Sequence, residues 1–386
     1  MRNVGVVTRG IRTPIVRQGD NLEEVVVESL LSAAKNENFT IRDRDIVAVT
    51  ESVLAKSQGN YVHIDDVAKD IENKYGKNAK IGVVFPIFSR NRFSLILKGI
   101  AKGAGEIILQ LSYPNDEVGN PIVDPNEIYE KKIDPFGAVF SEKEFRETFG
   151  YESTIHPFTK VDIIEYYKGL NENIQIIFAN DPTEILKHTD QVIVADIHTR
   201  ERDREVIIAA GGKKVYTLGD ILSTGINGSG FNSDYGLLGS NASTDSVLKL
   251  FPRDGEIFVE NVQKKLLEKT GKKLEVMVYG DGAFKDPVAG IWELADPVVA
   301  PAYTSGLEGT PSEYKLKYLA DTLGLKDEEI VEKIKEKKAS KEEALGTTPR
   351  RITDLVGSLA DLTSGSGDRG TPVVFVQGYF DNYSDE

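Results

Sequence analysis

The sequence contains no cysteine, one tryptophan, two methionines and four histidines among its 386 residues. The lack of cysteine excludes disulfide bonds, thiolate metal sites and a cysteine nucleophile. The sequence also has no His-Glu-x-x-His metal motif and no Gly-x-Ser-x-Gly nucleophile motif. We therefore assign no catalytic role to the histidines, which are His63, His156, His188 and His198.

Long apolar runs are also missing. No run approaches the roughly 20 residues that a membrane-spanning helix needs, and residues 1–7 resemble the start of a strand more than a signal peptide. Acidic residues outnumber basic ones by 61 to 47, and the net charge of −14 disfavours binding to nucleic-acid phosphates. The run 200–204 alternates in sign and is expected to form a solvated helix. We expect a cytoplasmic protein with neither a membrane nor a nucleic-acid partner.

What the sequence does contain is a regular alternation of two patterns. Short runs rich in β-branched residues predict strands. Apolar residues at helical spacing between them, as in 22–30 and 257–266, predict amphipathic helices, and the Lys/Glu-rich stretch 326–338 predicts an exposed one. The expected fold class is α/β, of the mixed α+β kind. The predicted strands lie at 46–49, 81–85, 107–109, 174–178, 192–194, 274–278 and 373–376.

The central part of the chain differs from its flanks. It has its own strand–helix–strand units, and its loops are rich in Pro, Asn and Gly, as in residues 113–121. We therefore interpret 76–230 as an inserted α/β segment or second domain, flanked by parts at 1–75 and 231–386.

A glycine-rich loop at 362–372 separates a predicted helix from the last strand. Its glycines and small hydroxyl residues let backbone N–H groups approach an anion closely, and Arg369 adds positive charge. The loop is not a Walker motif, because the Gly-Lys-Ser/Thr ending is absent. It is a candidate phosphate-binding loop, and an ordinary flexible connection is the alternative.

Two carboxylates and one lysine are the other candidates. Asp281 directly follows the strand at 274–278, where α/β proteins place ligand-binding groups, and Asp245 lies in an Asn-Ala-Ser-Thr-Asp segment. Together they could share divalent cations that bridge phosphate oxygens, although a lone Asp is more often a turn residue or helix cap. Lys56 follows a strand and precedes a glycine, so it could meet a phosphate or be an ordinary surface lysine.

These segments resemble the coenzyme F420-0:γ-glutamyl ligases, the ligases that join L-glutamate to a deazaflavin coenzyme. The resemblance rests on residues 13–22, 45–59 and 236–245, the strand ending in Gly280-Asp281, and 364–372, in the order that the family has them. It covers about 1–75 and 231–386. It implies a ligase core made by these two parts, with 76–230 as a large central insertion.

The resemblance also implies roles for individual residues. Asp245 and Asp281 would be catalytic and would bind metal, and Ser366 stands where the family has a metal-contacting side chain. The nucleotide would be held by Pro14, Lys56, Ser364, Gly365, Gly367, Asp368, Arg369, Gly370 and Thr371.

The reaction implied is the ligation of L-glutamate to a small-molecule carboxylate acceptor. GTP, with ATP as the alternative, would phosphorylate the acceptor. Mg²⁺ or Mn²⁺ would assist, with K⁺ as a helper. The resemblance also implies that the protein forms a homodimer. The acceptor stays open between the deazaflavin, a folate and another carboxylate. A nucleotide-dependent phosphotransferase or hydrolase, and a non-catalytic binding protein of the same fold, are the alternative functions.

Overall fold

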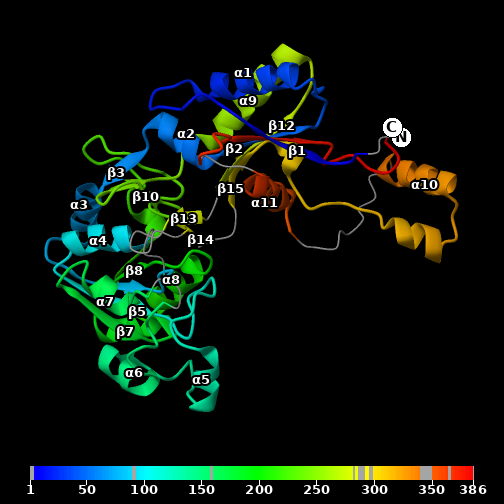
Figure 1. The fold of residues 1–386 in the computed structure, drawn as a ribbon. Helices are drawn as coiled ribbons and strands as arrows, with labels where there is room; N and C mark the ends of the chain where they lie inside the picture. The colour runs from blue at the N-terminus through cyan, green and yellow to red at the C-terminus, as the bar shows by residue number, and fades with distance from the viewer. Residues whose placement is uncertain are drawn as a thin grey trace. The chain divides into compact units, whose positions relative to one another are not determined.

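The computed structural model describes residues 4–88, 93–156, 160–280, 283–285, 292–294, 299–339, 350–363 and 367–385 (Figure 1). The chain forms two compact units. Unit 1 comprises Met1–Gln58, Asp254–Asp281 and Pro297–Glu386, and unit 2 comprises Gly59–Arg253 and Gly282–Asp296. The predicted mixed α/β fold is confirmed. The division at 75/76 and 230/231 stays a prediction, whereas the compact units change at 58/59 and 253/254.

Unit 1 is built on a five-stranded mixed sheet in the order β1-β16-β2-β12-β15. Only β2 and β12 pair in parallel, and the other neighbours are antiparallel. The bounds of these strands are β1 Val7–Ile11, β2 Ile46–Thr50, β12 Glu275–Gly280, β15 Val299–Tyr303 and β16 Val373–Gln377.

Helices cover both faces of this sheet, which explains why its central strands are apolar at most consecutive positions. In β2, Val47 and Val49 pack with helices α1 (Leu22–Asn36) and α9 (Gly255–Thr270). The alternate residues Ile46 and Ala48 pack with α11 (Ile352–Thr363). Figure 1 shows α1 and α9 side by side, and α11 beneath the strands.

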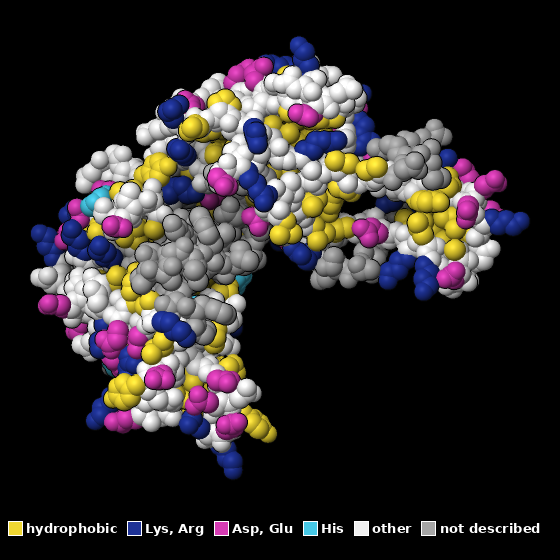
Figure 2. Space-filling model, in the orientation of Figure 1, with side chains coloured by type: hydrophobic (Ala, Val, Ile, Leu, Met, Phe, Trp, Pro, Cys, Tyr) yellow, Lys and Arg dark blue, Asp and Glu magenta, His cyan; other side chains and the backbone are white. Residues whose placement is uncertain are grey.

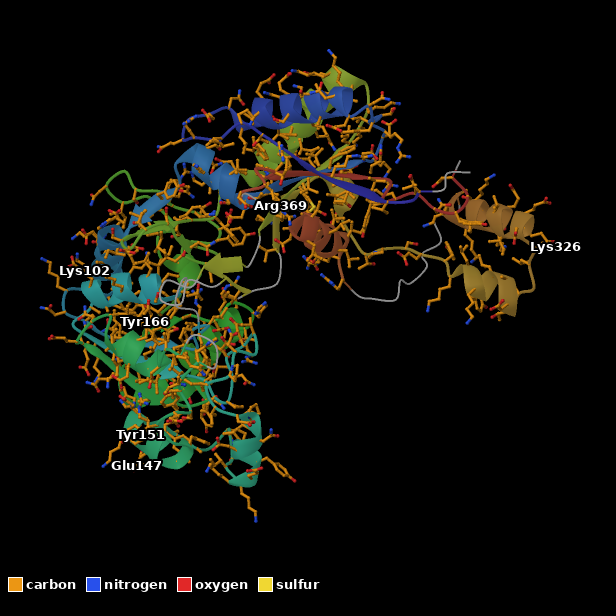
Figure 3. All side chains as sticks on the ribbon, viewed as in Figure 1. Lys102, Glu147, Tyr151, Tyr166, Lys326 and Arg369 are labelled. Carbon is orange, nitrogen blue, oxygen red and sulfur yellow. The ribbon has the colours of Figure 1, made fainter. Side chains whose placement is uncertain are left out.

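The predicted Lys/Glu-rich helix is α10 (Asp327–Ala339), and it is exposed except for one apolar stripe. Ile330 and Ile334 pack on Leu319 of the π-helical turn η4 (Tyr318–Thr322). Figure 3 labels Lys326 just before this helix. The remaining short helices of unit 1 are α2 (Glu51–Gln58) and η3 (Ser305–Leu307).

Unit 2 contains a six-stranded sheet in the order β6-β7-β5-β4-β8-β9. All of its strands are parallel except the short edge strand β6. The chain starts in the middle with β4, builds outward through β5 and β7, and then crosses to add β8 and β9 on the other side. This is a doubly wound arrangement. The bounds are β4 Lys80–Val84, β5 Glu106–Leu111, β6 Phe140–Ser141, β7 Ile174–Phe178, β8 Gln191–Val194 and β9 Lys214–Thr217.

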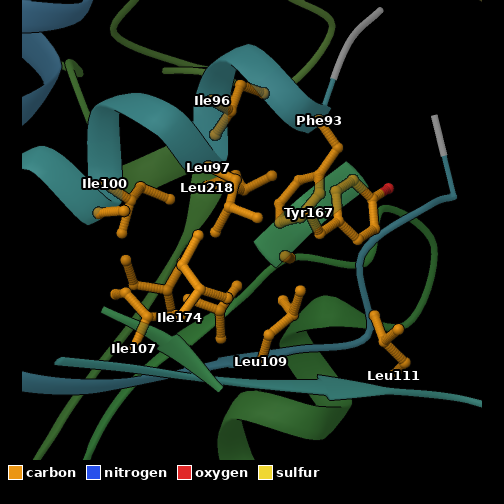
Figure 4. Packing of buried hydrophobic residues seen from close by; sticks show 14 of the residues in the cluster. Phe93, Ile96, Leu97, Ile100, Ile107, Leu109, Leu111, Tyr167, Ile174 and Leu218 are labelled. Carbon is orange, nitrogen blue, oxygen red and sulfur yellow. The ribbon is translucent and has the colours of Figure 1, made fainter. Parts of the chain in front are cut away.

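The larger core of unit 2 lies on one face of this sheet. Figure 4 shows helix α4 (Phe93–Gly103) placing Leu97 and Ile100 over Ile107 and Leu109 of β5. Each such side chain stabilises the fold by about 1.5–3 kcal/mol when fully buried. The same core takes side chains from α3 (Ile64–Tyr75), α6 (Glu142–Phe149) and α7 (Ile163–Lys168).

The opposite face of the sheet packs on η1 (Pro182–Lys187) and α8 (Arg200–Ala209). Helix α8 contains the 200–204 run, for which the sequence predicts a solvated helix. That prediction is wrong for Asp203, which is 1% exposed, because its carboxylate turns inward to Thr199. Unit 2 also contains α5 (Pro125–Glu130), η2 (Leu218–Asp220), the sheet β10 (Asn241–Ala242), β11 (Val247–Lys249) and β3 (Tyr61–His63), and the pair β13 (Ala283–Lys285) and β14 (Trp292–Leu294).

Two general surface properties bear on function. Figure 2 shows acidic and basic side chains of the described residues interspersed over the visible face. Within the described ranges, no helix combines the length and apolar character needed to cross a membrane.

Candidate functional site

Several of the segments singled out from the sequence meet at one end of the unit 1 sheet. In register, Ile11 at the end of β1 lies opposite Val373, the first residue of β16, and Val373 lies opposite Val49 near the end of β2. Thr50 then pairs with Tyr279 of β12. The chain on either side of these residues, including residues 12–14, 50–58 and 367–372, therefore starts from the same end of the sheet.

Backbone hydrogen bonds tie these segments together. The Thr13 N–H donates to the Gly370 carbonyl over 3.2 Å, and the Thr50 N–H donates to the Pro372 carbonyl over 2.9 Å. Gly370 has φ +65°, in the left-handed region that favours glycine. Pro14 thus lies one residue from the contact between Thr13 and the 367–371 loop. The nucleotide site that these residues would share stays a prediction.

Lys56 lies in the last turn of helix α2, which starts at this end of the sheet. The Ser57 carbonyl next to it accepts a 2.8 Å hydrogen bond from the Gly19 N–H. The Lys56 side chain is exposed. Its ammonium makes no hydrogen bond or ion pair with another described residue, so it is available to an anionic ligand.

The glycine-rich loop is described only in part. Ser364, Gly365 and Ser366 lie outside the described residues. Beyond them, the Gly370 N–H donates to the Gly367 carbonyl over 3.0 Å and closes a turn. Gly367, Asp368 and Arg369 are exposed at this turn, whereas Thr371 is 8% exposed.

Arg369 is held close to the helix that precedes the loop. Its Nη1 donates over 3.3 Å to the carbonyl of Thr363, the last residue of α11, and Figure 3 labels it beside the sheet. A cation at the C-terminal end of a helix is favourable for the helix dipole. Arg369 thus has a structural partner in addition to its predicted role.

A groove runs beside the same segments. It has a volume of about 940 Å³ and lies between the end of β1 and one face of α1. Its size is within the range of small-molecule sites. Arg9 places its guanidinium 4.6 Å from the centre of the Phe39 ring on one wall. The lining residues are Arg9–Pro14, Glu28, Ser29, Ser32, Ala33, Asn36, Glu37 and Phe39.

One acidic residue at this end of the sheet was not singled out from the sequence. Glu51 directly follows β2 and is 2% exposed, and Thr50 before it is 1% exposed. The Thr50 hydroxyl accepts a hydrogen bond from the Ser52 N–H over 3.2 Å. The signal that flagged Asp281, a carboxylate immediately after an apolar strand, applies equally to Glu51.

Asp245 lies in unit 2, in the tight turn between β10 and β11. The Ser243 and Thr244 N–H groups both donate to the Val247 carbonyl and close this turn. Asp245 is exposed. Its backbone carbonyl accepts from the Lys98 ammonium over 3.4 Å, while its carboxylate has no hydrogen-bond or ion-pair partner among the described residues.

Asp281, the second predicted metal ligand, lies outside the described residues, directly after β12. In the part of the chain that the structure describes, no group of three or more His, Asp and Glu side chains is arranged to hold a metal ion. An exposed carboxylate such as Asp245 fits a hard cation as one oxygen donor. The shared metal site stays a prediction.

These features describe an α/β protein in which several segments singled out from the sequence meet at one end of a mixed sheet. The comparison with family models agrees with an α/β protein and also identifies its family. The model of F420-0:Gamma-glutamyl ligase matches residues 10–378, and the chain therefore belongs to this family of ligases. The match runs through the central segment as well as through the two terminal parts. A search of curated proteins found no match.

Proposed function

We propose that the protein joins L-glutamate, or a similar amine, to a carboxylate acceptor through a nucleotide-derived acyl phosphate. Membership of the ligase family supports an amide-forming enzyme of deazaflavin-coenzyme biosynthesis. The observation that carries the finer proposal is the meeting of residues 13 and 14, helix α2 and the 367–371 turn at one end of the sheet.

The proposed reaction has two steps. An oxygen of the acceptor carboxylate attacks the γ-phosphorus of GTP, and GDP leaves with the electron pair of the broken P–O bond. The glutamate nitrogen then attacks the acyl carbon, phosphate leaves, and the nitrogen loses a proton to solvent. Both steps need charge neutralisation and positioning more than a nucleophilic side chain, which agrees with a sequence that lacks cysteine.

The chain's own groups supply these needs. The Lys56 ammonium is a point charge for a phosphate, and a glycine-rich turn exposes N–H groups to an anion. Asp245, Asp281 and Ser366 would hold Mg²⁺ or Mn²⁺, with K⁺ as a helper. When bound, the metal would neutralise charge on the phosphates. The same proposal includes a preference for GTP over ATP, a homodimeric state and a cytoplasmic location.

Nucleotide binding by Lys56 is tested by thermal shift with GTP and with ATP, each with and without Mn²⁺. A ligand that binds only the folded state raises Tm, and we expect a metal-dependent rise that is larger for GTP. The Lys56→Ala variant should bind GTP about tenfold more weakly, since hydrogen bonds to charged groups contribute about 1.5–3 kcal/mol. Lys35→Ala, which removes an exposed lysine from the last turn of α1, is the matched control.

Two results would contradict this proposal. Unchanged GTP affinity in Lys56→Ala would show that this lysine is only a surface residue. Phosphate release from GTP that does not depend on added L-glutamate would point to a hydrolase instead of a ligase.

A further inference from the structure

The six-stranded sheet of unit 2 has a topological switch point that none of the predicted ligase residues occupies. From β4 the chain goes to β5 on one side, and later from β8 to β9 on the other, so the connections leave the carboxyl ends of β4 and β8 in opposite directions. In open α/β sheets, the crevice at such a point is where ligands bind.

A buried carboxylate lies at this place. Asp196 follows β8 by two residues and is 1% exposed. Its Oδ2 accepts from the Thr199 N–H over 2.9 Å and from the Thr199 hydroxyl over 2.8 Å, which fixes the start of helix α8. Its Oδ1 is also buried, and it has no hydrogen-bond partner within the described ranges. One oxygen therefore has a structural role, and the other remains available as an acceptor.

Other acidic groups surround Asp196. The Thr199 hydroxyl also lies 3.2 Å from Oδ2 of Asp203. Glu117, from the segment after β5, accepts from the His198 N–H over 2.9 Å and faces His198 Nδ1 over 2.9 Å. Burial, together with the charges of Asp203 and Glu117, raises the pKa of Asp196 to about 6. A positive charge placed here would relieve this repulsion.

A second buried acceptor lies on the same side of the sheet. Gln110 of β5 and Val194 of β8 both pair in register with Val84, the last residue of β4. The Gln110 side chain is fully buried, and its Nε2 donates to the carbonyls of Ala179 and Asp181. Its Oε1 has no partner in the part of the chain described. Unpaired buried acceptors are rare, because each costs about 1–3 kcal/mol.

The backbone at the switch point is also unusual. Phe85, the first residue after β4, has φ +56° although it is not a glycine. Such strain collects at functional sites. The Phe85 N–H donates to the Gln110 backbone carbonyl over 3.0 Å, which ties this residue to β5.

The chemistry of these groups selects the ligand. Residues 85–92, which connect β4 to α4, contain no glycine, so the dinucleotide-binding Gly-x-Gly-x-x-Gly fingerprint is absent. The described carboxylates around Asp196 present acceptors. The nearby guanidiniums of Arg202 and Arg200 are already held by the Asp203 carboxylate and the Ile197 carbonyl, which disfavours a phosphate. A protonated primary amine has three N–H donors and a positive charge, as such acceptors require.

We propose that the carboxyl ends of β4 and β8 form a second small-molecule site, in which Asp196 Oδ1 binds the protonated primary amino group of its ligand. Glu117 supplies negative potential, whereas the charge of Asp203 is compensated in part by Arg202, whose Nη2 lies 2.7 Å from Asp203 Oδ1. The half-exposed His198, paired with Glu117, marks the rim of the site. The residues of this site all lie in unit 2, and the proposal does not depend on ligase activity.

The experiment uses the full chain at pH 8 and three probes of similar size. n-Butylammonium has charge and donors, tetramethylammonium has charge without donors, and n-butanol has a donor without charge. We expect only n-butylammonium to raise Tm in a saturable way. Equal shifts with the three probes, or no shift with n-butylammonium, would overturn the proposal without any variant being made and without GTP.

Two variants then test whether the amine binds at Asp196. Asp196→Asn should weaken n-butylammonium binding at least tenfold, measured by calorimetry, with the fold checked by circular dichroism. Asp190→Asn removes a carboxylate at the amino end of the same strand, where it pairs with Lys213, and should leave binding unchanged. Unchanged binding in Asp196→Asn, or an equal loss in Asp190→Asn, would contradict the placement.

Discussion

Replacing Asp245 by Asn is expected to lower glutamate-dependent turnover by about 10³-fold or more without changing the fold. The carboxylate of Asp245 is exposed and has no partner among the described residues, so its neutralisation removes no structural contact. A hard divalent cation prefers an ionised oxygen ligand, and the amide of Asn has no charge. Removing one group that stabilises transition-state charge costs about 10²–10³ in rate, and loss of the metal should cost more.

The test compares phosphate release from GTP, with and without L-glutamate, in the wild type and in Asp245→Asn. Asp234→Asn is a matched control, because Asp234 is an exposed aspartate in the same unit. It should keep both activity and Tm. Near-wild-type turnover in Asp245→Asn would remove this residue from the metal site, and a large drop in its Tm would indicate a structural role. Asp281→Asn should behave as Asp245→Asn does.

The elements of the fold were predictable where strands are covered on both faces. The runs that became β2, β4 and β8 consist almost entirely of buried apolar residues, a pattern that depends on local sequence alone. The order of the strands was not predictable, because it depends on pairings between distant segments, such as β1 with β16. The three-residue strands β3 and β11 are too short to give a periodic signal.

The candidate sites show the same limit. The sequence pointed to Pro14 and to the loop ending at Thr371, and the structure brings these segments together. The sequence did not point to Glu51 or Asp196. An aspartate or glutamate after a strand is usually a turn residue or cap, and only the tertiary structure shows that these two are buried. Burial depends on segments that are distant in the sequence, so it could not be predicted from position after a strand.

Asp196→Asn is expected to stabilise the protein at neutral pH by about 1–3 kcal/mol. The pKa of Asp196 is raised from 3.8 to about 6, chiefly by burial and then by the charges of Asp203 on α8 and Glu117 beside His198. A difference of about 2 units corresponds to about 3 kcal/mol. The buried Asn amide lacks an acceptor and offsets part of this gain.

The direction of the pKa shift of Asp196 determines how the free energy of unfolding changes with pH. Between about pH 4 and 6 the folded chain keeps a proton on Asp196 that the unfolded chain has released. The resulting stability is complete below pH 4 and is lost as the pH rises through 6. The difference in unfolding free energy between Asp196→Asn and the wild type should therefore grow over this interval and level off above about pH 7. Urea unfolding at several pH values measures it.

In Asp190→Asn, the difference in unfolding free energy from the wild type should depend on pH in the opposite way, so this variant is an internal control. The hydrogen bond from Lys213 lowers the pKa of Asp190, so its contribution is present at neutral pH and is lost on acidification. A flat difference curve for Asp196→Asn would show that the carboxylate carries no buried charge. A rising curve would mean that the protein keeps a buried negative charge at a cost in stability, although an uncharged Asn oxygen could accept the same hydrogen bonds from Thr199. Retention of such a group is expected when it binds a ligand, and this connects the stability measurement to the proposed amine site.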